Sequence, residues 1–268
     1  MRVLSSLLLL SRPRFWLYLA GPFLLGAAAS GVAFWFAPVF WLLFLFWLVP
    51  ANVLLYGVND YFDSDTDKFS SKKRGREFVF SGERWVLFAW VACLILGLVV
   101  AWLFSSWLVV AWLFLAVFYS APPLRFKAVL LLDSLSNSLY VLPGFFAYVL
   151  FAGAWPAWWV VVGACAWAAA MHLFSAVPDI KADKKAGVRT TAVVLGSRQS
   201  LQVAAIWWLL ALAAAGGSGS WVSLVFLVYP LLALLLVGQS QKVVSRAYWY
   251  FPFLNAAVGF CLFWVFLW

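Results

Sequence analysis

The chain has 268 residues, of which 67% are hydrophobic, 20% aromatic and only 10% charged. Soluble globular domains carry about 25% charged residues, so this composition excludes a water-soluble enzyme and predicts helices that face lipid. The formal net charge of +9 comes from short polar loops between apolar segments. This distribution is typical of membrane topology and gives no support for nucleic-acid binding.

A helix needs about 20 apolar residues to cross the hydrocarbon core of a bilayer. Segments of roughly that length lie near residues 15–30, 37–59, 85–104, 107–121, 132–151, 156–177, 201–215, 221–239 and 247–267. We therefore expect an all-α integral membrane protein with nine transmembrane helices, in which residues 1–268 form a single transmembrane domain.

Basic residues are confined to alternate polar stretches. All 18 Lys and Arg residues lie before the first apolar segment or in the loops that follow even-numbered segments. Because such residues mark the cytoplasmic side, we expect the N-terminus and these loops in the cytoplasm and the C-terminus outside the cell membrane. The first residues, with Arg2, Arg12 and Arg14, predict an interfacial helix that the three arginines anchor.

The first acidic cluster follows the second apolar segment. At about 100° per residue, Asp60, Asp63 and Asp67 share one face of a helical extension of that segment. Asn59 flanks this acidic stripe, and Asn52 continues it about two turns into the membrane. A polar side chain inside a span is costly, so both asparagines are candidates for substrate binding.

The second acidic cluster ends the sixth apolar segment. Asp179 and Asp183 are spaced i, i+4. His172 and Ser175 precede Asp179 by seven and four residues, so they lie on the same helical face. Pro178 cannot donate a backbone hydrogen bond, which predicts a bend in the helix just before Asp179.

Carboxylates gathered this closely repel one another unless cations lie between them. Oxygen ligands favour Mg²⁺ over zinc, and Mg²⁺ usually takes one or two carboxylates and completes its shell with water and substrate phosphates. The two clusters therefore predict a site for two Mg²⁺ ions and a diphosphate. The basic residues available to balance the remaining negative charge are Arg125, Lys127, Lys181, Lys184 and Arg189.

These motifs resemble those of the UbiA superfamily of intramembrane prenyltransferases. The NDxxDxxxD motif of that family is met by Asn59, Asp60, Asp63 and Asp67, and its DxxxD motif by Asp179 and Asp183. The resemblance implies a helical bundle around a central cavity. It also implies that all five aspartates are catalytic, and that they bind the Mg²⁺ that holds an isoprenyl diphosphate. Cytoplasmic loops at about 60–84 and 178–200 carry the two motifs.

The segment from Tyr119 to Lys127 is similar to the loop of this family that contacts the diphosphate. Many members have Tyr-xxx-Lys there, but position 123 of this chain is Pro. The resemblance therefore assigns the contact to Arg125 and Lys127. Tyr119 and Lys181 are further candidates for substrate binding.

Stretches near residues 131–144, 171–180 and 186–191 resemble the lycopene elongases of C50 carotenoid pathways. This subgroup adds a C5 unit from dimethylallyl diphosphate to lycopene, so the expected partners are an isoprenyl diphosphate, a lipophilic acceptor such as a carotenoid, and membrane lipid. Charge neutralisation by Mg²⁺ and basic residues would let diphosphate leave. An aromatic, dry cavity would shield the allylic cation until the acceptor attacks it.

Asp133, Asn137 and Tyr140 recur at i, i+4 and i+7 in the fifth apolar segment. We expect them to orient the acceptor end or the diphosphate, with His172 as another candidate. For Asn137 and Tyr140, hydrogen bonding between helices is an equally good interpretation.

Two alternatives concern the function as a whole. The first is prenylation of an aromatic or porphyrinoid acceptor, such as a quinone precursor or chlorophyllide. The second is a cation-coupled transporter, whose site would lie near the membrane midplane between inverted repeats. Every charged residue of this chain lies outside the centres of the apolar segments, and no repeat is visible, which disfavours transport.

Overall fold

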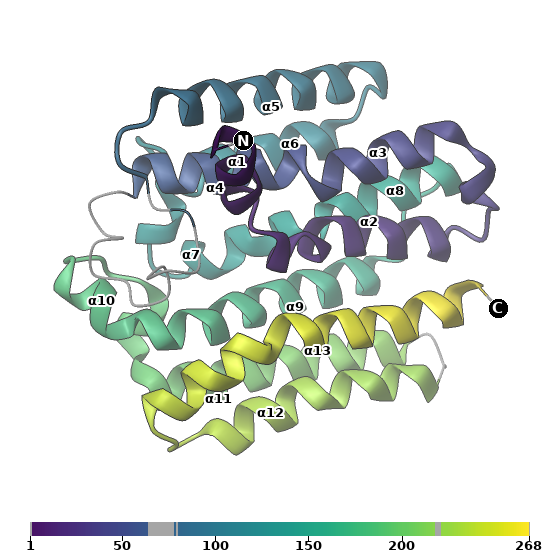
Figure 1. Ribbon diagram of the computed structural model, residues 1–268. Helices are drawn as coiled ribbons and strands as arrows, with labels where there is room; N and C mark the ends of the chain where they lie inside the picture. Colours follow the sequence, from purple (N-terminus) through teal and green to yellow (C-terminus); the bar gives the residue numbers. More distant parts are fainter. Residues whose placement is uncertain (1, 64–77, 79, 218–220, 268) are drawn as a thin grey trace. The chain divides into compact units, whose positions relative to one another are not determined.

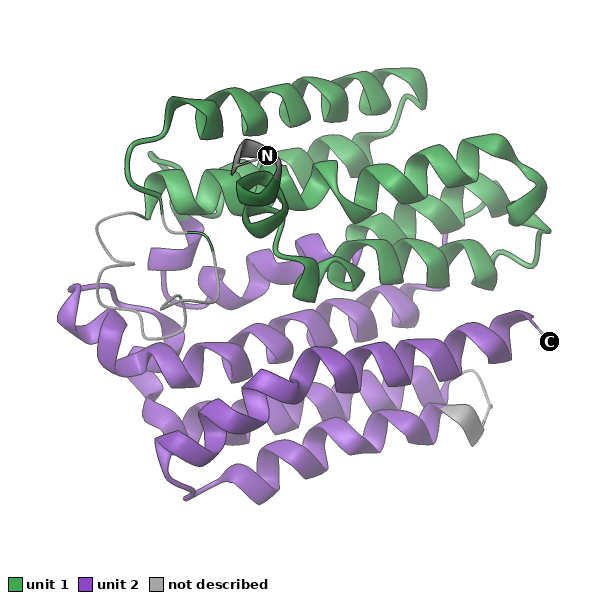
Figure 2. Ribbon diagram, in the orientation of Figure 1, with its two compact units in different colours: residues 1–125, 142–154 green, residues 126–141, 155–268 purple. Residues whose placement is uncertain are grey.

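The computed structural model describes residues 2–63, 78, 80–217 and 221–267, and within these ranges every regular element is a helix. The chain divides into two compact units, coloured separately in Figure 2. The first comprises Met1–Arg125 and Leu142–Ala154, and the second Phe126–Val141 and Trp155–Trp268. The sequence predicted one transmembrane domain, and each unit is described below by itself.

The helices of the first unit are α1 (Arg2–Leu10), η1 (Pro13–Phe15), α2 (Leu17–Ala29), η2 (Phe34–Phe36), α3 (Pro38–Leu48), α4 (Pro50–Phe62), α5 (Arg84–Leu103), α6 (Trp107–Phe118) and α8 (Leu142–Ala152). An aromatic core holds this unit together. Trp47 of α3 meets Trp112 of α6 edge to face, with ring centroids 4.9 Å apart, and Phe146 of α8 packs against Trp47. Such contacts give the helices a dry interior independent of lipid.

The helices of the second unit are η4 (Phe126–Ala128), α7 (Leu132–Leu135), η5 (Ser136–Tyr140), α9 (Trp158–Ala176), η6 (Val177–Asp179), α10 (Ile180–Lys185), α11 (Thr191–Gly216), η7 (Trp221–Leu227), α12 (Val228–Leu236) and α13 (Gln241–Leu267). Figure 1 labels the helices of both units. Rings from α9, α11, α12 and α13 form the core of the second unit: Phe174, Trp208, Tyr229 and Phe251.

Within the part of the chain that the structure describes, six helical stretches are long and apolar enough to cross a membrane: Pro38–Phe62, Arg84–Leu103, Leu132–Ala152, Trp158–Lys185, Thr191–Gly216 and Gln241–Leu267. Three shorter apolar helices cover Leu17–Ala29, Trp107–Phe118 and Ser223–Leu236. Each predicted apolar segment thus contains an apolar helix in the described structure. Six of them, not all nine, have the length of a complete span.

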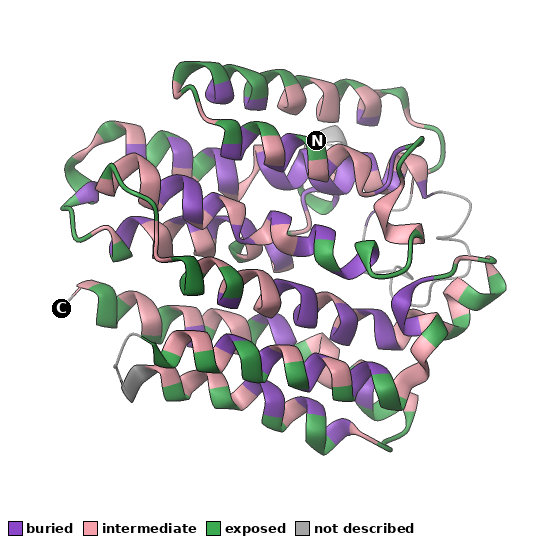
Figure 3. Ribbon diagram, turned by 180° about the vertical axis from the view of Figure 1, so that it is seen from behind, coloured by how far each residue is buried: buried purple, intermediate pink, exposed green. Residues whose placement is uncertain are grey.

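Large apolar side chains are exposed along these helices. In α5, the uppermost helix of Figure 3, Phe88 is 70% exposed and Trp102 78% exposed. Soluble proteins rarely expose apolar patches of this extent, whereas lipid covers them at no cost. Together with the six apolar stretches, this exposure identifies an integral membrane protein.

The second predicted span is interrupted where α3 gives way to α4. Val49 leaves helical geometry and Pro50 begins the new helix. Asn52 is completely buried, and its amide Nδ2 donates to the carbonyl oxygens of Trp47 and Leu48 at 3.1 and 3.0 Å. Side chains commonly satisfy carbonyls at such breaks in membrane helices. The buried Asn that we proposed for substrate binding therefore has a structural role at this break.

Two glycines bring the backbones of α2 and α8 together. A Cβ atom on Gly26 would overlap the carbonyl oxygen of Gly144, and one on Gly144 would lie 2.8 Å from the carbonyl oxygen of Pro22. Small residues allow this close helix approach in membrane proteins. The spacing of these two helices therefore depends on glycine at both positions.

We expect Gly26→Ala to destabilise the protein by about 1–3 kcal/mol or more, because α2 and α8 must separate to admit the methyl group. Thermal unfolding of the detergent-solubilised protein measures the effect. Gly21→Ala in the same helix is the control, because its Cβ would have Leu17 as its nearest neighbour at 3.9 Å. An unchanged unfolding temperature for Gly26→Ala would contradict the close approach of the two helices.

Candidate functional site

The first acidic motif lies at the end of α4. Asp63 is the C-cap of this helix, and its N–H bonds to the carbonyl oxygen of Asn59 at 3.0 Å. The residues by which the predicted helical extension would continue beyond Asp63 lie outside the described part of the chain. Asp60 and Asp63 are 0% and 3% exposed, and Asp67 lies outside the described residues.

Among the described residues, polar groups of Asn59, Ser120 and Arg125 lie at the Asp63 carboxylate. Asn59 Nδ2 donates to Asp63 Oδ2 at 2.7 Å and to Ser120 Oγ at 3.0 Å. Ser120 Oγ in turn donates to Asp63 Oδ2 at 3.4 Å, and Arg125 Nη2 lies 3.7 Å from Asp63 Oδ1. Ser120 and Arg125 belong to the loop after α6, so the structure brings this loop to the first motif.

Asp60 is paired with an arginine from the start of the chain. Arg12 Nη2 donates to Asp60 Oδ1 at 2.6 Å, and the same guanidinium lies over the Tyr56 ring, 4.5 Å from its centroid. We expected Arg12 to anchor an interfacial helix at the membrane surface. The helix is present as α1, but Arg12 instead holds the first aspartate of the motif.

Sequence reasoning missed Arg12 and Ser120 as residues of the site. The contacts that place them span 48 residues for Arg12 and 57 to 61 for Ser120. Local periodicity carries no information about such contacts. The position of Ser120, directly after Tyr119 in the loop that resembles a diphosphate-contacting segment, was the one available signal.

The second acidic motif lies where α9 ends. The helix stops at Ala176 and passes through the 3₁₀ turn η6 into α10, which confirms the bend predicted from Pro178. Gln241 Nε2 of α13 donates to the carbonyl oxygen of Pro178 at 3.0 Å. Asp179 and Asp183 are both half-buried, and Thr190 Oγ1 donates to Asp183 Oδ2 at 3.4 Å. Asp179 thus lies in a turn whose backbone accepts a hydrogen bond from α13, and Asp183 lies in the α10 helix that follows.

The other residues predicted to bind substrate lie in several different surroundings. Ser175 Oγ donates to the carbonyl oxygen of His172 at 2.8 Å, within the same helix. His172 Nε2 lies 3.9 Å from Asp133 Oδ2, and Lys181 is exposed on α10. Lys127 is half-buried in η4 of the second unit, and Tyr119 is half-buried after α6 of the first.

The predicted i, i+4, i+7 stripe of the fifth span is not a continuous α-helical face. The α-helix α7 ends at Leu135, and Asn137 and Tyr140 lie in the 3₁₀ helix η5. Asn137 Nδ2 donates to the carbonyl oxygen of Asp133 at 2.6 Å. Because 3₁₀ geometry turns three residues per turn, the 100° spacing does not apply here. The amide of Asn137 therefore makes a local hydrogen bond within the fifth apolar segment.

The donor set of the two motifs fits Mg²⁺. Asp60, Asp63, Asp179 and Asp183 supply carboxylate oxygens, the ligands that hard divalent cations prefer. Among the described residues, no group of three or more His, Cys, Asp and Glu side chains is placed to hold a metal ion. Mg²⁺ usually needs only one or two carboxylates beside substrate phosphates, and each motif by itself supplies that number within its own unit.

Comparison with known proteins identifies the family. Residues 15–249 match the UbiA prenyltransferase family. The chain belongs to this family. It is 46% identical over 263 residues to a lycopene elongase/hydratase of Haloferax volcanii, and the match covers 96% of this chain and 86% of that protein. It is therefore an enzyme of the UbiA prenyltransferase type, similar to the lycopene elongase subgroup.

The fold is also that of solved family members. A UbiA homolog from Archaeoglobus fulgidus bound to GPP and Mg²⁺ superposes with a TM-score of 0.68 at 22% identity, covering 96% of this chain and 99% of that one. The same homolog bound to DMAPP and Mg²⁺ gives a TM-score of 0.67 at 22% identity, covering 97% and 99%. The UbiA chain described here thus shares the helical fold of these proteins.

Proposed function

We propose that this UbiA enzyme transfers a dimethylallyl group from dimethylallyl diphosphate to lycopene, with Mg²⁺ bound by Asp60, Asp63, Asp67, Asp179 and Asp183. The observation that carries the proposal is the buried first motif, where Asp60 and Asp63 meet Arg12 and Arg125 at the end of an apolar helix. Buried carboxylates beside arginines suit a site for a metal diphosphate. The relative from Haloferax volcanii supports the choice of acceptor.

The residues of the first motif have separate tasks in this proposal. The charges of five aspartates and a diphosphate suggest two Mg²⁺ ions. These ions would neutralise the diphosphate as it leaves. Arg125, 3.7 Å from Asp63, is placed to bind diphosphate oxygens at the same point. Asn59 and Ser120 hold the Asp63 carboxylate in one orientation through their hydrogen bonds. Lys127, Lys181 and Tyr119 are proposed as further contacts of the diphosphate.

The bond changes follow from the donor and acceptor. The allylic C–O bond breaks and its electron pair leaves with the diphosphate. A terminal double bond of lycopene then attacks the allylic cation, which forms a C–C bond and leaves a tertiary carbocation on the product. Loss of a proton or capture of water ends the reaction. Tyr140 and His172, both half-buried in the second unit, are proposed to border the acceptor end.

We further propose that the acidic motifs face the cytoplasm. All 18 basic residues lie at the N-terminus or in the loops that share this side of the predicted topology, and basic loops remain on the cytoplasmic side during insertion. The N-terminus would then be cytoplasmic and the C-terminus external.

Product masses test the proposed acceptor. Membranes that contain the enzyme are incubated with Mg²⁺, lycopene and dimethylallyl diphosphate, and the expected result is C45 and C50 carotenoids. Parallel incubations replace lycopene by a quinone precursor or by chlorophyllide. Prenylation of either compound without any C45 or C50 product would contradict the lycopene assignment and favour an aromatic or porphyrinoid acceptor.

A further inference from the structure

Asp133 is a completely buried carboxylate whose hydrogen-bonding capacity is taken up by the protein. Thr191 donates its backbone N–H to Asp133 Oδ2 at 2.7 Å and its hydroxyl to Asp133 Oδ1. The N–H of Ser134 donates to Asp133 Oδ1 at 2.8 Å, and His172 Nε2 lies 3.9 Å from Asp133 Oδ2. A carboxylate offers about four acceptor positions. Hydrogen bonds from Ser134 and Thr191 take up three of them, so Asp133 is suited to a structural role.

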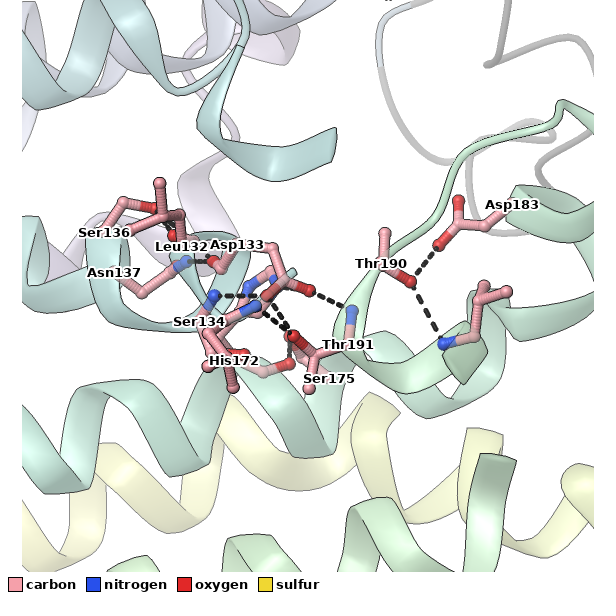
Figure 4. Close-up of polar contacts among 12 residues, drawn as sticks. Leu132, Asp133, Ser134, Ser136, Asn137, His172, Ser175, Asp183, Thr190 and Thr191 are labelled. Atoms are coloured by element: carbon pink, nitrogen blue, oxygen red, sulfur yellow. Dashed lines mark hydrogen bonds and ion pairs between the residues drawn. The ribbon is translucent and has the colours of Figure 1, made fainter. Parts of the chain in front are cut away.

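The contacts of Asp133 form a latch between the start of α7 and the start of α11, shown in Figure 4. A further hydrogen bond joins the same two segments with the donor on the other side: the N–H of Leu131 donates to Thr191 Oγ1 at 2.8 Å. Leu131 has a φ of 66°, which costs a residue with a side chain about 1–3 kcal/mol. The hydrogen bonds of the latch offset that strain and hold the backbone of Leu131 in this conformation.

The part of α11 that the latch holds is separated from the rest of the helix. Gly196 has φ 75° and ψ 170°, values outside the helical region, so α11 is kinked between its first turns and its long apolar part. The residues before the kink therefore do not inherit their position from the packed part of the helix. The hydrogen bonds of the latch help to hold them, together with the packing of the completely buried Ala192.

Thr190 connects this latch to the second acidic motif. It is the N-cap of α11, where its Oγ1 accepts a hydrogen bond from the N–H of Val193 at 3.2 Å. The same Oγ1 donates to Asp183 Oδ2 at 3.4 Å. Thr190 is adjacent to Thr191, so a change at the latch must move the hydroxyl that orients Asp183.

We propose that Asp133 is a positioning residue for the second acidic motif: it fixes Thr191, and through Thr190 it orients the carboxylate of Asp183 toward Mg²⁺. This inference rests on the proposed function, which makes Asp183 a metal ligand. It assigns to Asp133 a different role from the contact with acceptor or diphosphate that the sequence suggested. It also adds Thr190 and Thr191 to the residues on which metal binding depends.

Metal binding without turnover tests the proposal. Mn²⁺ binding to the purified enzyme is titrated by EPR in the presence of inorganic pyrophosphate, with thermal unfolding of each variant measured in parallel. Thr190→Val removes one hydrogen-bond donor to Asp183, and we expect Mn²⁺ binding about 10-fold weaker, as is typical for residues that orient metal ligands. Thr190→Ser keeps the hydroxyl and is expected to bind Mn²⁺ like the wild type.

Asp133→Asn is expected to weaken Mn²⁺ binding by a similar factor, because an amide cannot accept from both the N–H and the hydroxyl of Thr191. If Asp133 acts through Thr190, the effects of the two substitutions do not add. The double variant Asp133→Asn/Thr190→Val then binds Mn²⁺ as tightly as whichever single variant has the lower affinity. If Asp133→Asn fails to fold, Thr191→Val and Thr191→Ser take its place: Thr191→Val removes the hydroxyl that donates to Asp133 and should weaken Mn²⁺ binding, whereas Thr191→Ser keeps it and should not. Ser106→Ala is the matched control: it removes another N-cap hydroxyl, which accepts from the N–H of Val109 in α6, and should leave Mn²⁺ binding unchanged.

Each outcome has a distinct meaning. Folded Thr190→Val and Asp133→Asn variants that bind Mn²⁺ like the wild type overturn the inference. So does an Asp133→Asn variant in which only the KM for the acceptor changes, since that result would place Asp133 at the substrate. A wild-type enzyme that binds no Mn²⁺ with pyrophosphate would instead overturn the proposed metal function, and the inference with it.

Discussion

Replacement of Asp60 or Asp179 by Ala is expected to reduce prenyl transfer by about 100-fold or more, the usual loss when a charged group of a catalytic site is removed. Asp60 is completely buried beside Arg12 at the end of α4, and Asp179 lies at the turn between α9 and α10. If both bind the metal diphosphate, either loss leaves the departing diphosphate insufficiently neutralised. Initial rates with dimethylallyl diphosphate and lycopene measure the effect, with expression and thermal unfolding recorded for each variant.

Asp65→Ala is the control for this prediction. The helical spacing of the sequence places Asp65 away from the face shared by Asp60, Asp63 and Asp67, and Asp65 lies outside the described residues. We expect its loss to change the rate by less than about threefold. An equally large loss for Asp65→Ala would show that the helical-face argument selected the wrong carboxylates.

Removal of divalent metal should abolish activity and leave the fold intact. The proposed ligands are oxygen donors, so Mg²⁺ should restore the rate after chelation, whereas Zn²⁺, which prefers nitrogen and sulfur ligands, should restore little of it. The aromatic cores of both units consist of rings such as Trp47, Trp112, Phe174 and Trp208, and such packing does not depend on a metal. Helicity by circular dichroism is therefore expected to persist in the chelator.

Rates before and after treatment with EDTA, and after addition of each metal, measure this effect. Residual activity at the original rate in excess EDTA would contradict the proposed role of the five aspartates. Loss of helicity together with activity would show that the metal stabilises the fold and would require a different account of the motifs.

Local features of the fold were predictable because they depend on short stretches of chain. Hydrophobic length identified the apolar helices, and the missing N–H of Pro178 predicted the bend that η6 forms. Both acidic motifs were recognisable from the spacing of their carboxylates. The local geometry of the fifth span was not predictable, because nothing in its apolar pattern distinguishes an α-helix from the 3₁₀ helix η5.

The sequence by itself thus determined the membrane class, the order of the apolar helices and the identity of the acidic motifs, all of which follow from composition and near-neighbour spacing. Only the tertiary structure decided which groups hold these carboxylates. Arg12 reaches Asp60 across 48 residues, and Thr191 reaches Asp133 across 58. Such pairs are set by how helices pack, and a single sequence records no sign of packing between residues so far apart.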